Sequence, residues 1–120
     1  MRVYFRNNYS SRVWIAIMRY DPSACGSYGN WATEGWWSVN PGGQVWPFST
    51  TNRYACYYAE ADDGAFWAGP YGPMYVYWDA FSSCINIGST AAYDVVGLRL
   101  IDLGWWAWSP FATHTVTLTS

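Results

Sequence analysis

Apolar and polar side chains alternate along several parts of the chain, and a period of two residues predicts β-strands. The clearest case is Val13–Tyr20, in which both alternating sets of side chains are apolar. A strand with this pattern is covered on both faces. Residues 52–61 alternate large with small side chains, which favours a strand whose two faces pack against different layers. We therefore expect a sheet with structure on both sides of it.

Shorter apolar runs between turn signals predict the other strands. They lie at residues 3–5, 31–39, 44–48, 65–68, 74–78, 95–103 and 112–119. Pro47 lacks a backbone donor and places its strand at a sheet edge. The sequence Asp62-Asp63-Gly64 has the composition of a hairpin turn. A short helix or 3₁₀ turn is predicted at residues 79–87, and loops are predicted at residues 21–30, 69–73 and 88–93.

About eight or nine short strands in a chain of this length predict a single all-β domain, residues 1–120, folded as a compact antiparallel β-sandwich. A β-trefoil-like barrel is the alternative, because Trp-Ala pairs begin at residues 31, 67 and 106, a spacing near 40. The residues around these pairs do not repeat, and one Gln-x-Trp sequence is present, at residues 44–46. The sandwich is therefore the main prediction.

The stretch from Trp31 to Gly43 is the most distinctive part of the chain, because Trp36 and Trp37 stand next to each other before a turn. Adjacent residues on a strand point to opposite faces. One tryptophan is therefore expected in the core, and the other outward or in a second layer. A large outward ring beside a tight turn indicates a recognition surface.

The composition limits the classes of function. Aromatic residues make up 22% of the chain and charged residues only 12%, with six arginines and no lysine. This balance argues against disorder and favours β-structure. A net charge of −2 offers no basic field for nucleic acid. There is no apolar run of 18 residues, so no transmembrane helix is expected.

Three cysteines allow at most one internal disulfide and leave a thiol over. Cys56 and Cys84 are candidates to pair, with buried free thiols as the equal alternative. The sequence shows no N-terminal signal. The protein is therefore expected to be either cytoplasmic or processed, with a secreted or cell-surface location slightly favoured.

Motifs spread over almost the whole chain carry a family resemblance. They include Ser10-Ser11-x-Val13, Trp31-x-Thr33-x-Gly35-Trp36-Trp37, Val39-x-Pro41-Gly42, Tyr57-Tyr58-Ala59-Glu60-Ala61-x-Asp63-Gly64-Ala65, Phe81-x-x-Cys84 and Val96-Gly97-Leu98-Arg99-x-Ile101-Asp102. With these motifs in this order, the chain resembles the bacterial domain-of-unknown-function family 1036. The resemblance implies one compact β domain, found alone or attached to other modules, and it brings no known activity. Family members often have a cysteine near the position of Phe5, where this chain has none.

Catalytic patterns are weak. His114 is the only histidine, and a Cys–His pair with Cys56 or Cys84 lacks a third residue to orient it. Glu34 and Glu60 are the only glutamates and the candidate pair for a glycoside hydrolase, which needs two carboxyl groups ~5–10 Å apart. The turn at residues 62–64 lacks the full acidic pattern of a calcium loop. No metal or other cofactor is expected.

The aromatic residues in loops and beside turns remain, and the candidate ligand-binding residues come from them and from one acid: Tyr28, Trp31, Glu34, Trp36, Trp37, Trp67 and Tyr71, with Trp105, Trp106 and Trp108 as further loop aromatics. Aromatic rings pack against sugar C–H faces, while nearby Asn, Asp and Glu bind hydroxyls. The leading hypothesis is a non-enzymatic module that binds glycans. A self-associating or fibre-forming subunit, using residues 44–48 or 3–5 as an open edge, and a membrane-active defence protein are alternatives. A glycoside hydrolase ranks last.

Overall fold

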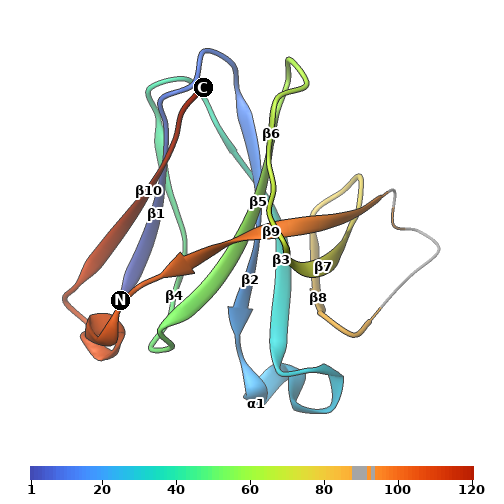
Figure 1. The fold of residues 1–120 in the computed structure, drawn as a ribbon, viewed down its shortest axis with the longest axis vertical. Helices are drawn as coiled ribbons and strands as arrows, with labels where there is room; N and C mark the ends of the chain where they lie inside the picture. Colours follow the sequence, from blue (N-terminus) through green and yellow to red (C-terminus); the bar gives the residue numbers. More distant parts are fainter. Residues whose placement is uncertain (88–91, 93) are drawn as a thin grey trace.

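Two β-sheets stacked face to face form the body of the protein (Figure 1). The computed structural model describes residues 1–87, 92 and 94–120. The strands are β1 (Arg2–Asn7), β2 (Val13–Tyr20), β3 (Trp31–Val39), β4 (Gln44–Ser49), β5 (Tyr54–Ala61), β6 (Phe66–Trp67), β7 (Tyr71–Val76), β8 (Phe81–Cys84), β9 (Asp94–Asp102) and β10 (Thr113–Leu118). Within the described residues, the strands are interrupted by three short helices, namely α1 (Pro22–Cys25), η1 (Gly26–Tyr28) and η2 (Trp105–Trp108). The prediction of an all-β sandwich is confirmed.

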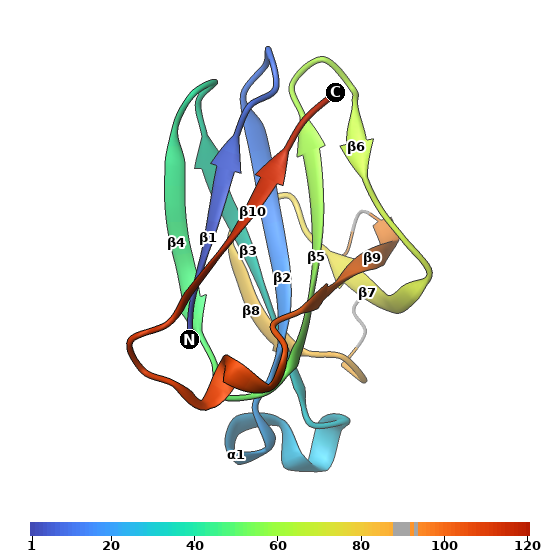
Figure 2. The ribbon, with the colours of Figure 1, turned by 60° about the vertical axis from the view of Figure 1, so that its left-hand side comes forward.

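The larger sheet has the strand order β7-β9-β5-β2-β3-β8, with β6 paired to β5, and the smaller sheet has the order β10-β1-β4. Figure 2 shows the three strands of the smaller sheet side by side. Among the residues that the structure describes, all strand pairs are antiparallel except β1 with β10, which run parallel. A β-trefoil requires one strand arrangement that occurs three times along the chain. The two sheets of the described residues contain no such threefold repeat.

Strand β2 lies in the middle of the larger sheet and is buried on both faces, as its pattern predicts. Val13, Ile15 and Ile17 join the core between the two sheets. Ala16 and Met18 join a second core on the opposite face, where side chains of β7 and β9 pack against β2 and β5. The large sheet curls so that β9 crosses the face of β5 and β2 (Figure 1). Two cores explain why a strand with no polar face is stable in this fold.

Several sequence predictions need correction. Residues 79–87 contain strand β8 and no helix, because Ser83 pairs with Thr33 of β3 and extends the sheet. The predicted loop at residues 21–30 contains α1 and η1, and Asp21 caps α1 by accepting the N–H of Ala24. The predicted loop at residues 69–73 ends early, since Tyr71 already pairs with Leu98. The predicted loop at residues 88–93 falls on residues outside the described part, apart from residue 92.

The two candidate edge strands have different positions. Strand β4, which contains Pro47, is an edge of the smaller sheet, as predicted. Strand β1 is internal, because β10 pairs with one side of it and β4 with the other. The sequence does not show this, since the partner β10 comes from the other end of the described chain.

The disulfide joins Cys25 of α1 to Cys84 of β8, with 5.7 Å between their Cα atoms. The predicted Cys56–Cys84 pairing is therefore wrong. Strands β5 and β8 are three steps apart in the sheet order, which is roughly 14 Å and too far for a disulfide. Cys56 is a buried free thiol, and desolvation raises its pKa to about 11. The thiol is therefore protonated and a weak nucleophile at neutral pH.

Candidate functional site

The central tryptophan pair is divided between the two faces of β3, as predicted. Trp36 packs edge-on against Tyr58 and Phe81 in the second core, and its Nε1 donates to the carbonyl oxygen of Tyr77 at 2.7 Å. Trp37 packs against the core between the sheets. Both rings are half-buried, so they have a structural role in addition to any contact with a ligand.

The other predicted site residues are dispersed. Trp67 is buried, and its Nε1 donates to the carbonyl oxygen of Thr119. Trp31 is half-buried and packs edge-on against Tyr20. Tyr28 and Tyr71 are exposed and lie on η1 and β7, whereas Trp36 and Trp37 point to opposite faces of β3. The seven predicted residues therefore do not form one continuous surface.

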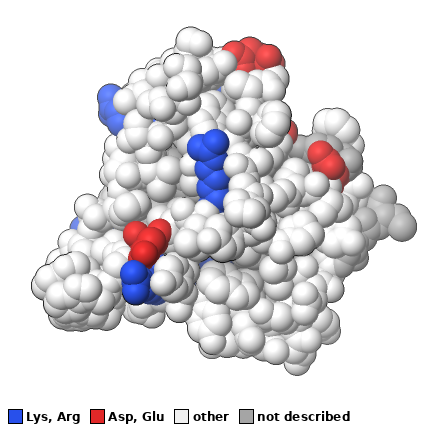
Figure 3. All heavy atoms as spheres, viewed as in Figure 1, with Lys and Arg blue, Asp and Glu red and all other residues white. Residues whose placement is uncertain are grey.

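Four strongly exposed aromatic side chains gather in and after η2. Trp105, Trp106, Trp108 and Phe111 are 53% to 87% exposed, and we call these four residues the aromatic cap. The rings of Trp105 and Trp106 stack with centroids 4.0 Å apart. Residues 103–112 contain no charged side chain, and the corner of the molecule where η2 lies is mostly white in Figure 3. The cap is an apolar projection at one end of the sandwich.

A charged pair stabilises the base of the aromatic cap. Arg53 donates through Nε and an Nη atom to the two carboxylate oxygens of Asp102, at 2.8 and 2.9 Å. These hydrogen bonds raise the pKa of Arg53 and lower the pKa of Asp102. Asp102 also accepts the backbone N–H of Gly104, the residue before η2. The start of η2 is therefore held in place by a carboxylate that stays ionised.

A groove of about 720 Å³ lies beside the aromatic cap, between the smaller sheet and the loop that follows β2. Its lining includes three exposed aromatic side chains, those of Tyr20, Trp46 and Trp108. Polar side chains beside them include Arg2, Arg19, Asp21 and Asn52. We call this the Trp46 groove. It combines flat apolar faces with hydrogen-bonding groups, which is the composition of a small-molecule or sugar site.

Trp46 is held in a defined orientation by its neighbours. Its Nε1 donates to the carbonyl oxygen of Phe48 at 3.0 Å. Its ring stacks on Tyr4 of the adjacent strand, with centroids 5.9 Å apart and 26° between the planes. The guanidinium of Arg2 lies 5.7 Å from the centre of the same ring. The ring is therefore held in place while half of the side chain stays exposed at the groove.

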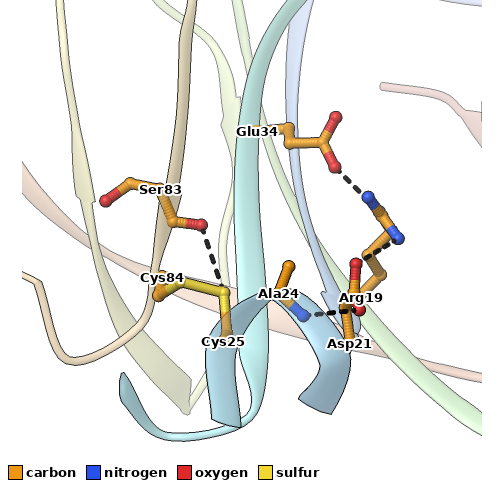
Figure 4. Close-up of a disulfide and its surroundings, with 7 residues drawn as sticks. All are labelled: Arg19, Asp21, Ala24, Cys25, Glu34, Ser83 and Cys84. Carbon is orange, nitrogen blue, oxygen red and sulfur yellow. Dashed lines mark hydrogen bonds and ion pairs between the residues drawn. A yellow bond between two sulfur atoms is a disulfide. The ribbon is translucent and has the colours of Figure 1, made fainter. Parts of the chain in front are cut away.

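The polar wall of the groove is an ion-paired network centred on Arg19 (Figure 4). Arg19 donates from Nε to Glu34 at 2.7 Å and from Nη1 to Asp21 at 3.1 Å. Asn52 donates to the carbonyl oxygen of Tyr54, which leaves its own side-chain oxygen as an acceptor. The site residue Glu34 thus supports this wall through Arg19 and is not one of the groove-lining residues.

The two glutamates lie on opposite faces of the larger sheet. Glu34 pairs with Ile17 of β2, and Glu60 pairs with Trp14 of the same strand. Positions 14 and 17 are an odd number of residues apart, so their side chains, and those of their partners, point to opposite faces. Tyr58 donates its hydroxyl hydrogen to Glu60. The structure therefore does not bring the two carboxyl groups together across a sugar site.

The Cys–His hypothesis also lacks the required geometry. Cys84 is in the disulfide, and Cys56 lies in the second core. His114 is on β10, in the smaller sheet, opposite Val3 of the core between the sheets. The larger sheet therefore separates the free thiol from the imidazole.

Comparison of the chain with models of protein families, with curated proteins and with solved structures gives no match. The resemblance to the domain-of-unknown-function family 1036 therefore stays a prediction. In the part of the chain that the structure describes, no three His, Cys, Asp or Glu side chains come together as a metal site. Within the same residues, no helix has the length and apolar character needed to cross a membrane.

Of the three aromatic residues that build the groove, only Trp108 was among the candidate loop aromatics predicted from the sequence. Trp46 appeared in it only as part of a Gln-x-Trp sequence, and Arg2, Tyr20 and Asn52 carried no motif. One signal was available, namely an aromatic residue beside Pro47 on a strand predicted to be an edge. Side chains on an edge strand have fewer neighbours, so the chance that Trp46 is exposed was higher there than elsewhere.

Proposed function

We propose that the protein is a non-enzymatic binding module that recognises glycans in the Trp46 groove. The observation that carries the proposal is the arrangement of three exposed rings, Tyr20, Trp46 and Trp108, around one hollow. Sugar rings present flat C–H faces that pack on aromatic rings, and their hydroxyls need polar partners. Asp21 and Asn52 offer acceptors, and Arg2 offers donors, at the same hollow.

Replacing Trp46 with alanine is expected to weaken glycan binding by at least about tenfold, because an aromatic anchor at the centre of a site typically contributes more than 1.4 kcal/mol. The measurement is a glycan array followed by titration calorimetry on the sugars that bind. Trp78→Ala is the matched control, since Trp78 is 80% exposed and lies outside the groove. Circular dichroism establishes that both variants fold. Equal binding by wild type and the Trp46 variant would contradict the proposed site.

Membrane contact is the second candidate function, and the aromatic cap is the observation that favours it. Tryptophan is favoured at the interface between lipid and water, and the cap presents three tryptophans and a phenylalanine without a charge among them. Such a cap can enter the headgroup region from one end of the sandwich. Self-association through the same apolar surface is the competing explanation.

Replacing both Trp105 and Phe111 with serine is expected to reduce partitioning into phosphatidylcholine vesicles by at least about tenfold, since it removes two large apolar side chains from the insertion surface. Vesicle co-sedimentation measures the partitioning, and Trp78→Ser is the control. Light scattering of the same samples without lipid measures size. Absence of vesicle binding by the wild-type protein would remove this candidate, and a size that falls on dilution would favour self-association instead.

A further inference from the structure

The outer face of the smaller sheet carries a regular array of polar and aromatic side chains. Val3 and Phe5 of β1 point into the core, so Arg2, Tyr4 and Arg6 point outward. We call this outward surface the β1 face. Its neighbours in register are Thr113, Thr115 and Thr117 on β10 and Ser49, Trp46 and Gln44 on β4. The three threonines are exposed, so a column of hydroxyl groups lies next to the row of arginine, tyrosine and arginine.

Charge on the β1 face has one sign. Strands β1, β4 and β10 contain no aspartate or glutamate. Elsewhere, Arg12, Arg19 and Arg53 form ion pairs with carboxylates. Within the described residues, Arg2 and Arg6 form none. Two guanidinium groups therefore lie on one face of a protein whose net charge is −2.

Both arginines keep donors for a ligand. Arg6 is exposed and uses Nε to donate to Asn8, which leaves its two terminal nitrogens available. Arg2 lies over the ring of Trp46, and its Nε is buried without a hydrogen-bond partner among the described residues. A buried donor of this kind is costly to leave unsatisfied. Arg2 also lines the Trp46 groove, where its other guanidinium nitrogens can donate to an anionic oxygen.

We propose that the β1 face continues the Trp46 groove and that the glycan it binds is anionic, with carboxylate or sulfate groups on a linear chain. The inference rests on the proposed function and names the class of glycan. Arg2 and Arg6 are four residues apart on one strand, about 13 Å between Cα atoms, with the ring of Tyr4 between them. A chain that carries an anion on alternate sugars presents charge, apolar face and charge in the same order.

The arginines suit this chemistry better than lysines would. A guanidinium forms two parallel hydrogen bonds with a carboxylate or sulfate, which fixes the orientation of the group. The threonine column supplies donors and acceptors for hydroxyls along the same direction. Two local charges on an acidic protein do not provide the field needed for the dense phosphates of nucleic acid, so nucleic acid is a negative control.

The test measures binding to hyaluronan, polygalacturonate and chondroitin sulfate, and to hyaluronan and polygalacturonate whose carboxyl groups have been reduced to alcohols. Titration calorimetry is carried out at low and high NaCl. We expect the native polymers to bind at least about tenfold more tightly than the reduced ones, with binding weakened by salt. Single-stranded DNA is expected not to bind.

Arg6→Gln is expected to weaken binding to the anionic polymers about five- to tenfold, and Arg6→Lys to recover part of the loss. Arg99→Gln is the matched control, because it removes the same charge from a strand of the other sheet, where Arg99 donates to the carbonyl oxygen of Ala68. Arg6 is exposed, so thermal unfolding of its variants is expected to match the wild type.

The outcomes separate this inference from the proposed function. Native and reduced polymers could bind equally, with this binding lost in Trp46→Ala but kept in Arg6→Gln. That result would overturn the anionic class of glycan and leave the proposed glycan-binding module in place. Binding to DNA as tight as to hyaluronan would overturn recognition of a saccharide chain. Binding to none of the polymers, and to no neutral glycan on the array, would overturn both.

Discussion

Replacing Phe5 with alanine is expected to lower the free energy of unfolding by about 3–5 kcal/mol. Phe5 is fully buried between the two sheets, where its ring meets the ring of Tyr57 edge-on with centroids 5.3 Å apart. The substitution removes the ring from β1 of the smaller sheet and leaves a cavity facing β5 of the larger one. A single domain is stable by only about 5–15 kcal/mol, so this loss is a large fraction of the total.

Thermal and denaturant unfolding measure the loss, and the midpoint temperature is expected to fall by roughly 12–20 °C. Phe111→Ala is the matched control, because the same side chain is 87% exposed there. Its effect is expected to stay within about 0.5 kcal/mol. If the two variants unfolded alike, the packing of β1 against the larger sheet would be contradicted.

Removing the disulfide with the double substitution Cys25→Ala and Cys84→Ala is expected to lower the free energy of unfolding by roughly 4 kcal/mol. The two cysteines are separated by 59 positions in the sequence, and a cross-link over a loop of this length restricts the unfolded chain by about that amount. The bond attaches α1 to β8 at the edge of the larger sheet. Its loss is therefore expected to release the end of the sandwich near the Trp46 groove.

Chemical unfolding with and without reductant measures this effect. Cys56→Ala is the control, because it also removes a buried cysteine but no cross-link. Thiol titration in denaturant is expected to detect one thiol in the oxidised protein and three after reduction. Three thiols before reduction, or peptide mapping that joins Cys56 to Cys84, would contradict the pairing.

The pattern of alternation predicted most of the fold, because a strand's two faces are a local property. Val13–Tyr20 shows this well, since its two apolar faces predicted the two cores that the structure contains. Strand β8 was missed, because Phe81–Cys84 is short and has no alternation of its own. Its strand conformation comes from pairing with β3. Likewise, the partner of Cys84 depended on strand order, which no local pattern contains.

The candidate site was less predictable than the fold. Strand geometry predicted that Trp36 and Trp37 point to opposite faces, and in the structure they pack against different cores. Exposure was harder to predict, because it depends on what the curled sheet covers. Trp67 is buried, whereas Trp46 is half exposed. Both nevertheless lie close to glycine and proline residues in the sequence. The Trp46 groove unites β1, β4 and η2, which only the tertiary fold brings together.

The parallel pairing of β1 with β10 has a consequence for the order of folding. Arg2 pairs with Thr113 and Asn7 with Leu118, so β1 can pair with β10 only after strands β2 to β9 have been synthesised, whereas its other neighbour, β4, is made much earlier. Contacts of such long sequence separation slow folding, because loop closure precedes the energetic gain. During synthesis, one edge of β1 stays open until residues 113–118 leave the ribosome. A newly made chain is therefore exposed to strand-to-strand aggregation at this edge of β1 until β10 has been made and closes it.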